Sequence, residues 1–335
     1  MIKRFIDHLF SAQINSSATK FGYTFYLGIS LITITILLFL SGFLLVFYYL
    51  PMPEFAYNSL LFIEENVFLG RFLRSFHRML THFFLIFSAM HMLRIIFSGV
   101  YKKRGFNYKV GYIIFLLIIF YAYTGYLLPF DQLSFWATTT GMELVKQLPL
   151  GDKIVGLLVP FSVEDRYTLL RFYALHIVIL PVLITFLLSV HMYVLRKDKL
   201  YIQHTTKLSL SDYKKLILKV ATTCLFVTMF FSVVVNAPLG VPADFTTPPN
   251  PAKSAWFLLW IQEVVGIRGY LFNGLALVFV LYLFLPDISK RKQGYRWFSK
   301  DDLFTWSFTL LFSIFIIILT ILAYYFRGEN WSLVF

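Results

Sequence analysis

Long apolar runs, separated by shorter polar or basic stretches, dominate the pattern along this chain of 335 residues. A helix needs about 20 apolar residues to cross the hydrocarbon core of a membrane. Backbone polar groups must be satisfied internally in lipid, so apolar runs of this length predict helices. The runs of sufficient length are residues 25–49, 77–98, 109–128, 172–195, 216–235, 267–285 and 303–325. The sequence therefore predicts an all-α membrane protein with about seven transmembrane helices.

The polar, basic segment 196–215 separates the first four predicted helices from the last three. We expect a four-helix domain over residues 1–200 and a three-helix domain over residues 201–335. The connections at 129–171 and 236–266 are long, and they contain proline-rich and short helical patterns. Long structured loops are usually functional, and both connections fall on the same predicted side, so they could build one shared site.

Composition and charge agree with a membrane protein. Hydrophobic residues make up 59% of the chain and charged residues 14%, against about half and a quarter in soluble domains. The basic residues gather in links on one side, for example Lys102, Lys103, Arg104, Arg196, Lys197, Lys290, Arg291 and Lys292. By the positive-inside rule this side is cytoplasmic, which also places the N-terminus in the cytoplasm. The net charge of +13 is therefore a sign of topology, and no nucleic acid partner is expected.

Four histidines form a matched pattern in the second and fourth predicted helices. His77 and His91 are fourteen residues apart, and His176 and His191 are fifteen apart. An α-helix turns 100° and rises about 1.5 Å per residue, so each pair lies on roughly one face, about 21 to 22 Å apart. The two helices are parallel, so His77 can face His176 near the outer surface and His91 can face His191 near the inner one.

Facing neutral imidazoles are an axial ligand set for haem iron. A satisfied interior polar group is the alternative for any single membrane histidine, but four at matched depths favour two haems stacked across the membrane. His82 is rotated by about 140° from His77 and is interpreted as a non-ligand. Cys224 is the single cysteine, so a CxxCH attachment site is impossible and both haems are expected to be non-covalent.

Glycines repeat the same interval on the first and third predicted helices. Gly28 and Gly42 are fourteen residues apart, as are Gly111 and Gly125. Gly42 and Gly125 share the outer depth of the histidines, and the other two share the inner depth. Glycine lets a backbone approach another body closely. Plain helix packing is the alternative, but the shared interval favours a flat macrocycle between four helices.

Arginines lie where the histidine-bearing helices meet water. Arg74, Arg78 and Arg171 lie at the outer ends, and Arg94 and Arg196 lie at the inner ends. We interpret them as partners of the anionic haem propionates, with snorkelling topology charges as the alternative.

With these residues in place, the chain resembles the cytochrome b family of bc1 and b6f-type quinol:cytochrome c oxidoreductases. The 14- and 15-residue histidine intervals are similar to those of the b6 branch. The layout of four plus three helices is similar to cytochrome b6 fused to subunit IV. The segments that carry the resemblance are SGFLLVFYYLP (41–51), RSFHR (74–78), HMLR (91–94), GYLLPFDQLSFWA (125–137), LLRFYALH (169–176) and FRGENW (326–331).

The resemblance implies that quinol is oxidised at an outer pocket built from the two long connections. One electron would go to a Rieske iron–sulfur protein and then to a c-type cytochrome. The other would cross the membrane lipid through the outer and inner haems and reduce quinone at an inner site. The resemblance also implies a homodimeric complex in an energy-transducing membrane, here expected to be a bacterial cytoplasmic membrane.

Two positions depart from the family pattern. The b6 branch carries a covalent extra haem through a cysteine two residues before the first glycine, where this chain has Tyr26. No covalent haem is therefore expected there. The PEWY motif of the family is replaced by SAWF, Ser254 to Phe257, so its glutamate and tyrosine are missing. Trp256 and Phe257 are still expected to line the outer quinol pocket.

A different group must then take the quinol proton. We predict Glu263, which lies eight residues after Ala255 and about 80° past two full helical turns from it. It is one of few acids in an apolar stretch. Asp131 is the rival candidate. Candidate polar groups for the inner quinone site are Lys20, Asp198 and His204.

Two other functions stay open at this point. One is a dihaem anchor that passes electrons between the quinone pool and a peripheral dehydrogenase or reductase. The other is a transporter in which membrane histidines relay protons. The long outer connections and the last three helices favour the quinol:cytochrome c oxidoreductase, because an anchor needs only the four-helix bundle.

Overall fold

The computed structural model describes residues 13–15, 21–197, 207–292 and 294–334. The predicted polar groups of the inner quinone site, Lys20, Asp198 and His204, lie outside these residues. The described part is almost entirely helical, which confirms the predicted all-α class. Its two strands, β1 (Gln13–Asn15) and β2 (Lys207–Ser209), pair antiparallel.

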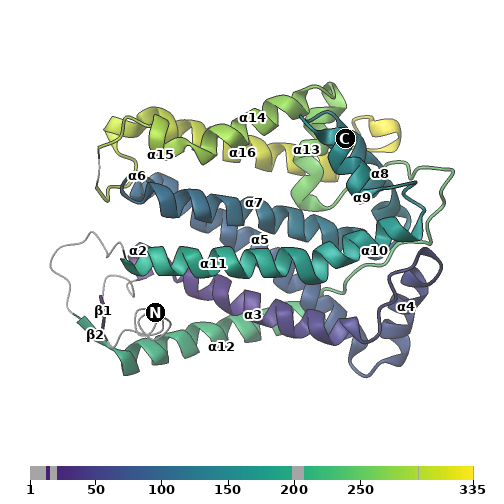
Figure 1. Ribbon diagram of the computed structural model, residues 1–335, viewed down its shortest axis with the longest axis horizontal. Helices are drawn as coiled ribbons and strands as arrows, with labels where there is room; N and C mark the ends of the chain where they lie inside the picture. The colour runs from purple at the N-terminus through teal and green to yellow at the C-terminus, as the bar shows by residue number, and fades with distance from the viewer. Residues whose placement is uncertain (1–12, 16–20, 198–206, 293, 335) are drawn as a thin grey trace.

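The helices that carry the histidines and glycines lie side by side along the longest axis of the molecule (Figure 1). Helix α3 packs on α5, and α7 packs on α5 and α11. Apolar side chains such as Ile34, Leu80 and Ile114 fill the space between them. These helices are α3 (Leu27–Val46), α5 (Gly70–Ser98), α7 (Gly105–Leu127), α10 (Arg166–Ala174) and α11 (Leu180–Lys197), with short α2 (Phe21–Thr24) and α6 (Val100–Lys103) at one end.

Six helices are long and apolar enough to cross a membrane among the described residues. The predicted span 267–285 is the exception. It forms α14 (Leu271–Leu283), which follows α13 (Trp256–Ile267) after a break at Arg268, where the backbone is extended. Short α15 (Leu285–Ile288) ends the segment, with Pro286 in its first turn. With 13 residues, α14 is only about 20 Å long.

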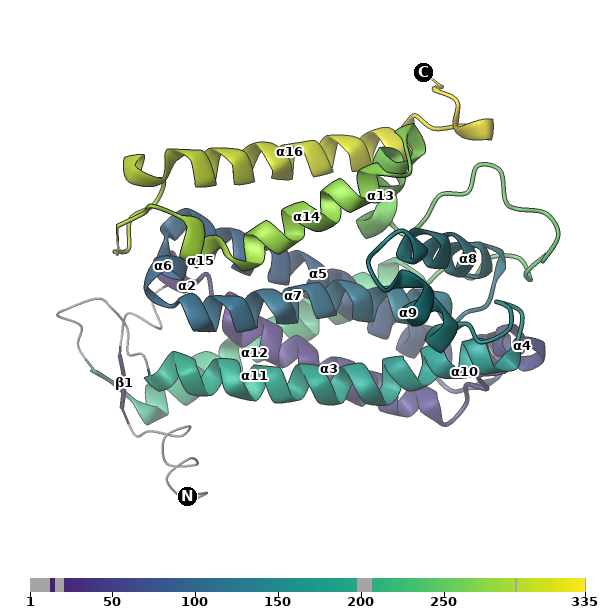
Figure 2. The same ribbon diagram turned by 45° about the horizontal axis from the view of Figure 1, so that its top comes forward.

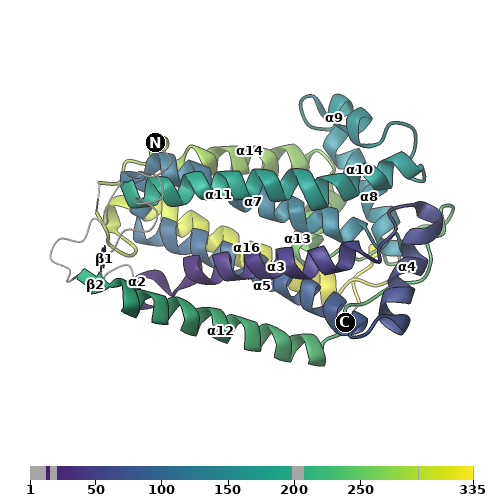
Figure 3. The ribbon, with the colours of Figure 1, turned by 60° about the horizontal axis from the view of Figure 1, so that its bottom comes forward.

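The helices after residue 209 attach to the first four at two separate edges. Helix α12 (Leu210–Val234) packs on α3 and α5, as Figure 3 shows. Helix α16 (Leu303–Tyr325) packs on α13 at the opposite edge. The division into domains at residue 200 stays a prediction.

One end of the bundle carries three further helices from the connections (Figure 2). They are α4 (Pro53–Asn66), α8 (Gln132–Lys146) and α9 (Gly151–Leu158). Asp131 caps α8, accepting a hydrogen bond from Ser134 N at 2.9 Å, and its second oxygen accepts from Gly240 N at 2.8 Å. The two long connections are therefore joined through one carboxylate. We call this end the outer end, following the predicted orientation, and the other the inner end.

The inner end has its own buried polar cluster. Arg291 and Asp302 form an ion pair at 3.3 Å with both side chains almost fully buried. The Tyr101 hydroxyl donates to Asp302 Oδ2 at 2.6 Å, and Tyr101 itself is completely buried. A 3₁₀ turn (Lys300–Asp302) presents the carboxylate. The cluster fixes the link before α16 against the link between α5 and α7. The remaining 3₁₀ turn is Glu329–Trp331.

Candidate functional site

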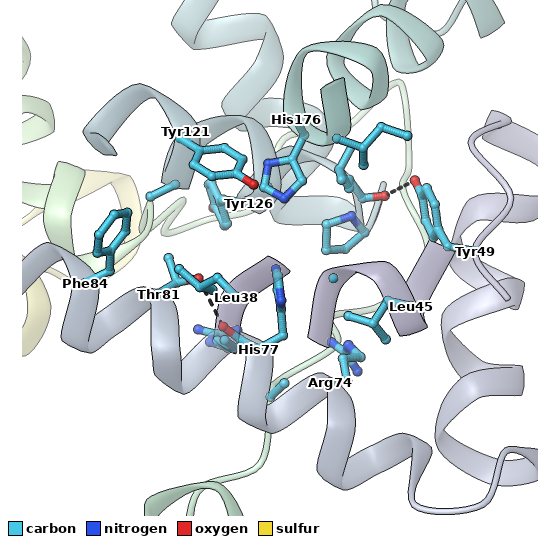
Figure 4. A pocket seen from close by; sticks show the side chains of 18 of the residues that line it. Leu38, Leu45, Tyr49, Arg74, His77, Thr81, Phe84, Tyr121, Tyr126 and His176 are labelled. Carbon is cyan, nitrogen blue, oxygen red and sulfur yellow. Dashed lines mark hydrogen bonds between the residues drawn. The ribbon is translucent and has the colours of Figure 1, made fainter. Parts of the chain in front are cut away.

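His77 and His176 face each other across a cavity in the outer half of the bundle (Figure 4). Their ring centroids are 6.3 Å apart, and the rings are inclined at 72°. The cavity measures about 730 Å³. It is lined by α3, α5, α7, the continuous helical segment formed by α10 and α11, and the start of α13. The structure therefore brings together the outer pair that the sequence predicted.

A hydroxyl holds the Nδ1 atom of each outer imidazole. Ser41 Oγ lies 2.9 Å from His77 Nδ1, and Thr124 Oγ1 lies 3.1 Å from His176 Nδ1. Each hydroxyl residue directly precedes one of the predicted glycines, Gly42 or Gly125. Hydrogen bonding at Nδ1 leaves Nε2 for a metal and fixes the ring orientation, as is usual for metal-binding histidines.

Three of the four predicted glycines lie directly against an imidazole. A Cβ atom added to Gly42 would be 3.2 Å from His77 Cε1, and one added to Gly125 would be 2.6 Å from His176 Cε1. At Gly111 the distance to His191 Cε1 would be 3.0 Å. Within the described part of the chain, a Cβ at Gly28 would meet nothing within 4 Å.

The inner pair is held differently. Nδ1 of His91 and Nδ1 of His191 are buried, and no side-chain hydroxyl among the described residues holds either atom. The residues before the inner glycines, Leu27 and Val110, are apolar and offer no hydroxyl. The close approach of Gly111 to the His191 ring matches that of the outer glycines to their imidazoles and fits a haem site.

A π-helical turn (Leu175–Ile179) carries His176 between α10 and α11. The Leu180 N–H donates to the Leu175 carbonyl, five residues back. Pro181 follows at once and has no N–H to continue the α-helical ladder. A π turn holds one residue more than an α turn, so the fifteen-residue interval to His191 covers the same helical phase as the fourteen-residue interval in α5. The sequence prediction from ideal helices missed this correction.

The predicted propionate arginines differ in their surroundings. Arg78 is exposed and lines the cavity. Arg74 also lines it, but it is only 8% exposed, forms an ion pair with Glu64 and donates to the Pro238 carbonyl. Arg171 donates to the carbonyl of Leu157.

At the inner end, Arg94 lies three residues after His91, in the last turns of α5, and Arg196 lies near the end of α11. Their contact with propionates stays a prediction.

Trp256 and Phe257 both line the cavity, together with Ala255 before them. The Trp256 indole Nε1–H donates to His82 Nδ1 at 3.0 Å. His82 lines the cavity too. Its interpretation as a non-ligand stays a prediction, and the sequence did not indicate its contact with the SAWF segment, 174 residues away.

The two predicted carboxylates are not in the lining of this cavity as the described residues form it. Glu263 is 4% exposed, and its oxygens accept hydrogen bonds from the Arg327 guanidinium and from Trp331 Nε1, the latter at 3.0 Å. Asp131 is 8% exposed, and one of its oxygens caps α8 while the other accepts a hydrogen bond from Gly240 N. The motif FRGENW thus supplies a partner for Glu263 that periodicity alone could not reveal.

A second, smaller hollow of about 350 Å³ lies between α3, α5 and α12, nearer the inner end. Tyr26, which precedes α3, lines it with Ser30, Lys219 and Cys224. Tyr26 has no thiol, so the cysteine link of the b6 branch cannot form at that position.

A membrane bundle in which two helices each carry two imidazoles, with the outer pair facing across a cavity, is typical of transmembrane haem proteins. Comparisons with known proteins narrow this class. Residues 82–254 match the family model described as cytochrome b(N-terminal)/b6/petB. Cytochrome b6 of Heliomicrobium gestii is 35% identical over 159 residues, which are 47% of this chain and 75% of that protein.

Two longer matches extend the comparison. The menaquinol:cytochrome c reductase cytochrome b subunit of Bacillus subtilis is 30% identical over 195 residues, 57% of this chain and 87% of the relative. Cytochrome b of Dictyostelium discoideum is 32% identical over 309 residues, 86% of this chain and 78% of the relative. A chain of a solved hyperthermophilic respiratory Complex III superposes with a TM-score of 0.81 at 22% identity, covering 96% of this chain and 88% of the other, which shows the shared fold.

The chain belongs to the cytochrome b/b6 family. It is thus a multi-pass membrane oxidoreductase of electron transport, and the family implies b-type haem.

Proposed function

We propose that this chain is the cytochrome b subunit of a Rieske/cytochrome b complex that oxidises quinol at the outer end and reduces quinone at the inner end. The observation that carries the proposal is the facing pair His77 and His176, each backed by a hydroxyl and a glycine, on the wall of an apolar cavity. Relatives are named for cytochrome b, cytochrome b6 and menaquinol:cytochrome c reductase.

Two non-covalent b haems fit the residues present. His77 and His176 would hold the outer one, and His91 and His191 the inner one. When bound, haem supplies one-electron redox chemistry at two depths of the membrane. The protein orients the imidazoles, keeps water from the bundle core and places Arg78 at the outer cavity.

The proposed quinol pocket is the part of the outer cavity that His82, Trp256 and Phe257 line, beside the space between His77 and His176 that the outer haem would fill. Trp256 and Phe257 contribute aromatic surface at its wall, which suits a flat, mostly apolar ring with a few polar contacts. Glu263 and Asp131 remain candidates for accepting the quinol proton, although each would first have to leave its present hydrogen-bond partners.

The hollow beside Tyr26 supports an inner quinone site between α3, α5 and α12. Lys219, Thr223 and Ser30 offer polar atoms among apolar walls. The hollow lies at the start of α3, where Phe25 and Tyr26 line it.

The partners of the proposed complex are a Rieske iron–sulfur protein, a c-type cytochrome and a second copy of this chain. The charge pattern supports a cytoplasmic N-terminus in a bacterial membrane. The contribution to proton-motive force follows from releasing quinol protons outside and taking up protons inside.

The test is a reduced-minus-oxidised spectrum of the purified complex, together with its quinol:cytochrome c reductase activity and its composition by mass spectrometry. Two b-type haems and a Rieske subunit support the proposal. Two haems with a flavoprotein or another dehydrogenase in place of the Rieske subunit would indicate the anchor function. A preparation without b haem would overturn both.

A further inference from the structure

Oxidation of a quinol releases two protons, and an apolar cavity must provide a group that receives at least one of them at hydrogen-bonding distance. The side chains with titratable groups in the described lining are Tyr49, Arg74, His77, Arg78, His82, Tyr121, Tyr126, Tyr173 and His176. Their protonation state near neutral pH decides which of them can accept a proton.

Most of these groups cannot accept a proton near neutral pH. Arginine stays protonated and tyrosine titrates near pH 10. Burial raises the pKa of Tyr49 still further, and its hydroxyl donates to the Leu128 carbonyl at 2.6 Å. His77 and His176 are committed to iron in the proposed function. Only His82 remains in the described lining with an intrinsic pKa in the neutral range.

The contacts of His82 define which ring atom can act. The Trp256 indole is a donor only, so Nδ1 of His82 is the acceptor in their 3.0 Å contact. In the neutral ring Nε2 then carries the hydrogen. Arg78 Nε lies 3.4 Å from Nε2, which is longer than an ordinary hydrogen bond. Nδ1, the basic atom of His82, therefore accepts a hydrogen bond from the weakly acidic indole N–H of Trp256 at the start of α13.

We propose that His82 is the proton acceptor for quinol in the outer cavity. A quinol hydroxyl replaces the Trp256 N–H at Nδ1. The quinol O–H bond then breaks and an N–H bond forms at Nδ1, which gives an imidazolium. One electron leaves with this proton to a one-electron acceptor of the proposed function, on which this inference rests. The second O–H bond breaks and the second electron leaves after His82 has released the first proton and can accept the second at Nδ1.

Two neighbours adjust the step. Arg78 lies one turn closer to the outer end and is exposed. Its positive charge beside the imidazolium favours release of the proton toward that end. Trp256 returns to Nδ1 once the proton has left, which restores the starting tautomer. The carboxylates Glu263 and Asp131, by contrast, already accept hydrogen bonds from fixed partners.

The experiment uses the intact complex with His82→Gln and His82→Glu, and with Ser88→Ala as a matched control. Ser88 lies on the same helix and donates to the carbonyl of Leu85. Spectra must first show both haems in every variant. Quinol oxidation is then followed from pH 5.5 to 8.5 with a c-type cytochrome as the final acceptor.

We expect His82→Gln to slow quinol oxidation by about 100-fold, as for loss of a general base. His82→Glu should recover at least about a tenth of the wild-type rate, and the acidic limb of its pH profile should move to lower pH because a carboxyl group has a lower intrinsic pKa than imidazole. Ser88→Ala should match the wild type.

A His82→Gln variant that oxidises quinol at the wild-type rate overturns the assignment. Equal slowing in the Gln and Glu variants, with an unshifted pH profile, also overturns it, because His82 would then only position Trp256. If the wild-type complex itself does not oxidise quinol, the proposed function fails and this inference fails with it.

Discussion

The outer and inner halves of the bundle use the same imidazole and glycine plan but support their histidines differently. In the outer half, Ser41 and Thr124 hold Nδ1 of the two rings. In the inner half, the corresponding positions before the glycines are Leu27 and Val110, and no side-chain hydroxyl among the described residues holds the Nδ1 atoms. The spacing of the histidines and glycines does not reveal this difference, because it lies in the residue directly before each glycine.

The hydroxyl contacts of the outer pair bear on the reduction potential of an iron bound there. When Nδ1–H donates to a hydroxyl, the opposite ring nitrogen becomes a more basic ligand. A more basic ligand set stabilises oxidised iron and lowers the reduction potential. With two haems bound as proposed, the two hydroxyls would lower the reduction potential of the outer haem and so favour electron flow from the outer pair toward the inner pair.

Removing one outer ligand should have the largest effect on this comparison. His77→Ala or His176→Ala should abolish the outer haem signal and leave the inner one, because only the outer iron would lose an axial ligand. His91→Ala should do the reverse. The measurement is haem content and reduced-minus-oxidised spectra of purified variants. Loss of a haem in His82→Gln would contradict the assignment of helix faces.

Filling the glycines should have the next largest effect. Gly125→Leu should exclude the outer haem and Gly111→Leu the inner one, because Cβ atoms there would approach the imidazoles to 2.6 and 3.0 Å. Gly28→Ala should be the mildest, since its Cβ meets no described atom within 4 Å. Haem content distinguishes these cases. Equal loss of both haems from a single change would indicate general misfolding.

Removing the hydroxyls should have a smaller effect, confined to the outer half. Ser41→Ala with Thr124→Val should weaken outer haem binding by about 10- to 100-fold, the usual effect of losing such contacts, and should raise its midpoint potential. Potentiometric titration of both haems is the measurement. The inner potential serves as the internal reference, and a parallel shift of both potentials would argue against a local cause.

The smallest effect on the haems is expected from the buried ion pairs at the two ends. Glu263→Gln leaves the Arg327 guanidinium without its anion, and Asp302→Asn does the same to Arg291. Breaking a buried pair costs about 3 to 5 kcal/mol, so both variants should lose thermal stability while they keep both haems. A Glu263→Gln variant of unchanged stability that oxidises quinol about 100-fold more slowly would restore Glu263 as the proton acceptor.

Hydropathy and spacing were sufficient to predict the helix class, the outer histidine pair and the close approach of three glycines. These features repeat along single helices, where local periodicity determines position. The sequence also contained a helix start that was not used: Pro53 at the first turn of α4, with Glu54 beside it. Proline is favoured at that position because its missing N–H is not needed there.

Contacts between distant segments could not be predicted in this way. Glu263 meets Arg327 across 64 residues, and Trp256 meets His82 across 174. No local pattern specifies either pair, since each depends on how α13 packs against a segment distant in the sequence. The apolar run 267–285 was expected to be one long span, but its helix α14 begins only at Leu271 and ends at Leu283, before α15.

The π turn around His176 makes residue counting an unsafe measure of geometry in this family of bundles. A one-residue insertion in a regular helix rotates everything beyond it by about 100°. Here the turn that precedes Pro181 absorbs the additional residue, so the chain beyond it keeps its orientation. Two membrane helices can therefore differ by an insertion between fixed ligands and still present the same face. Deleting one residue from Val178 to Leu180 together with Pro181→Leu should preserve both histidine positions, whereas the deletion alone should not.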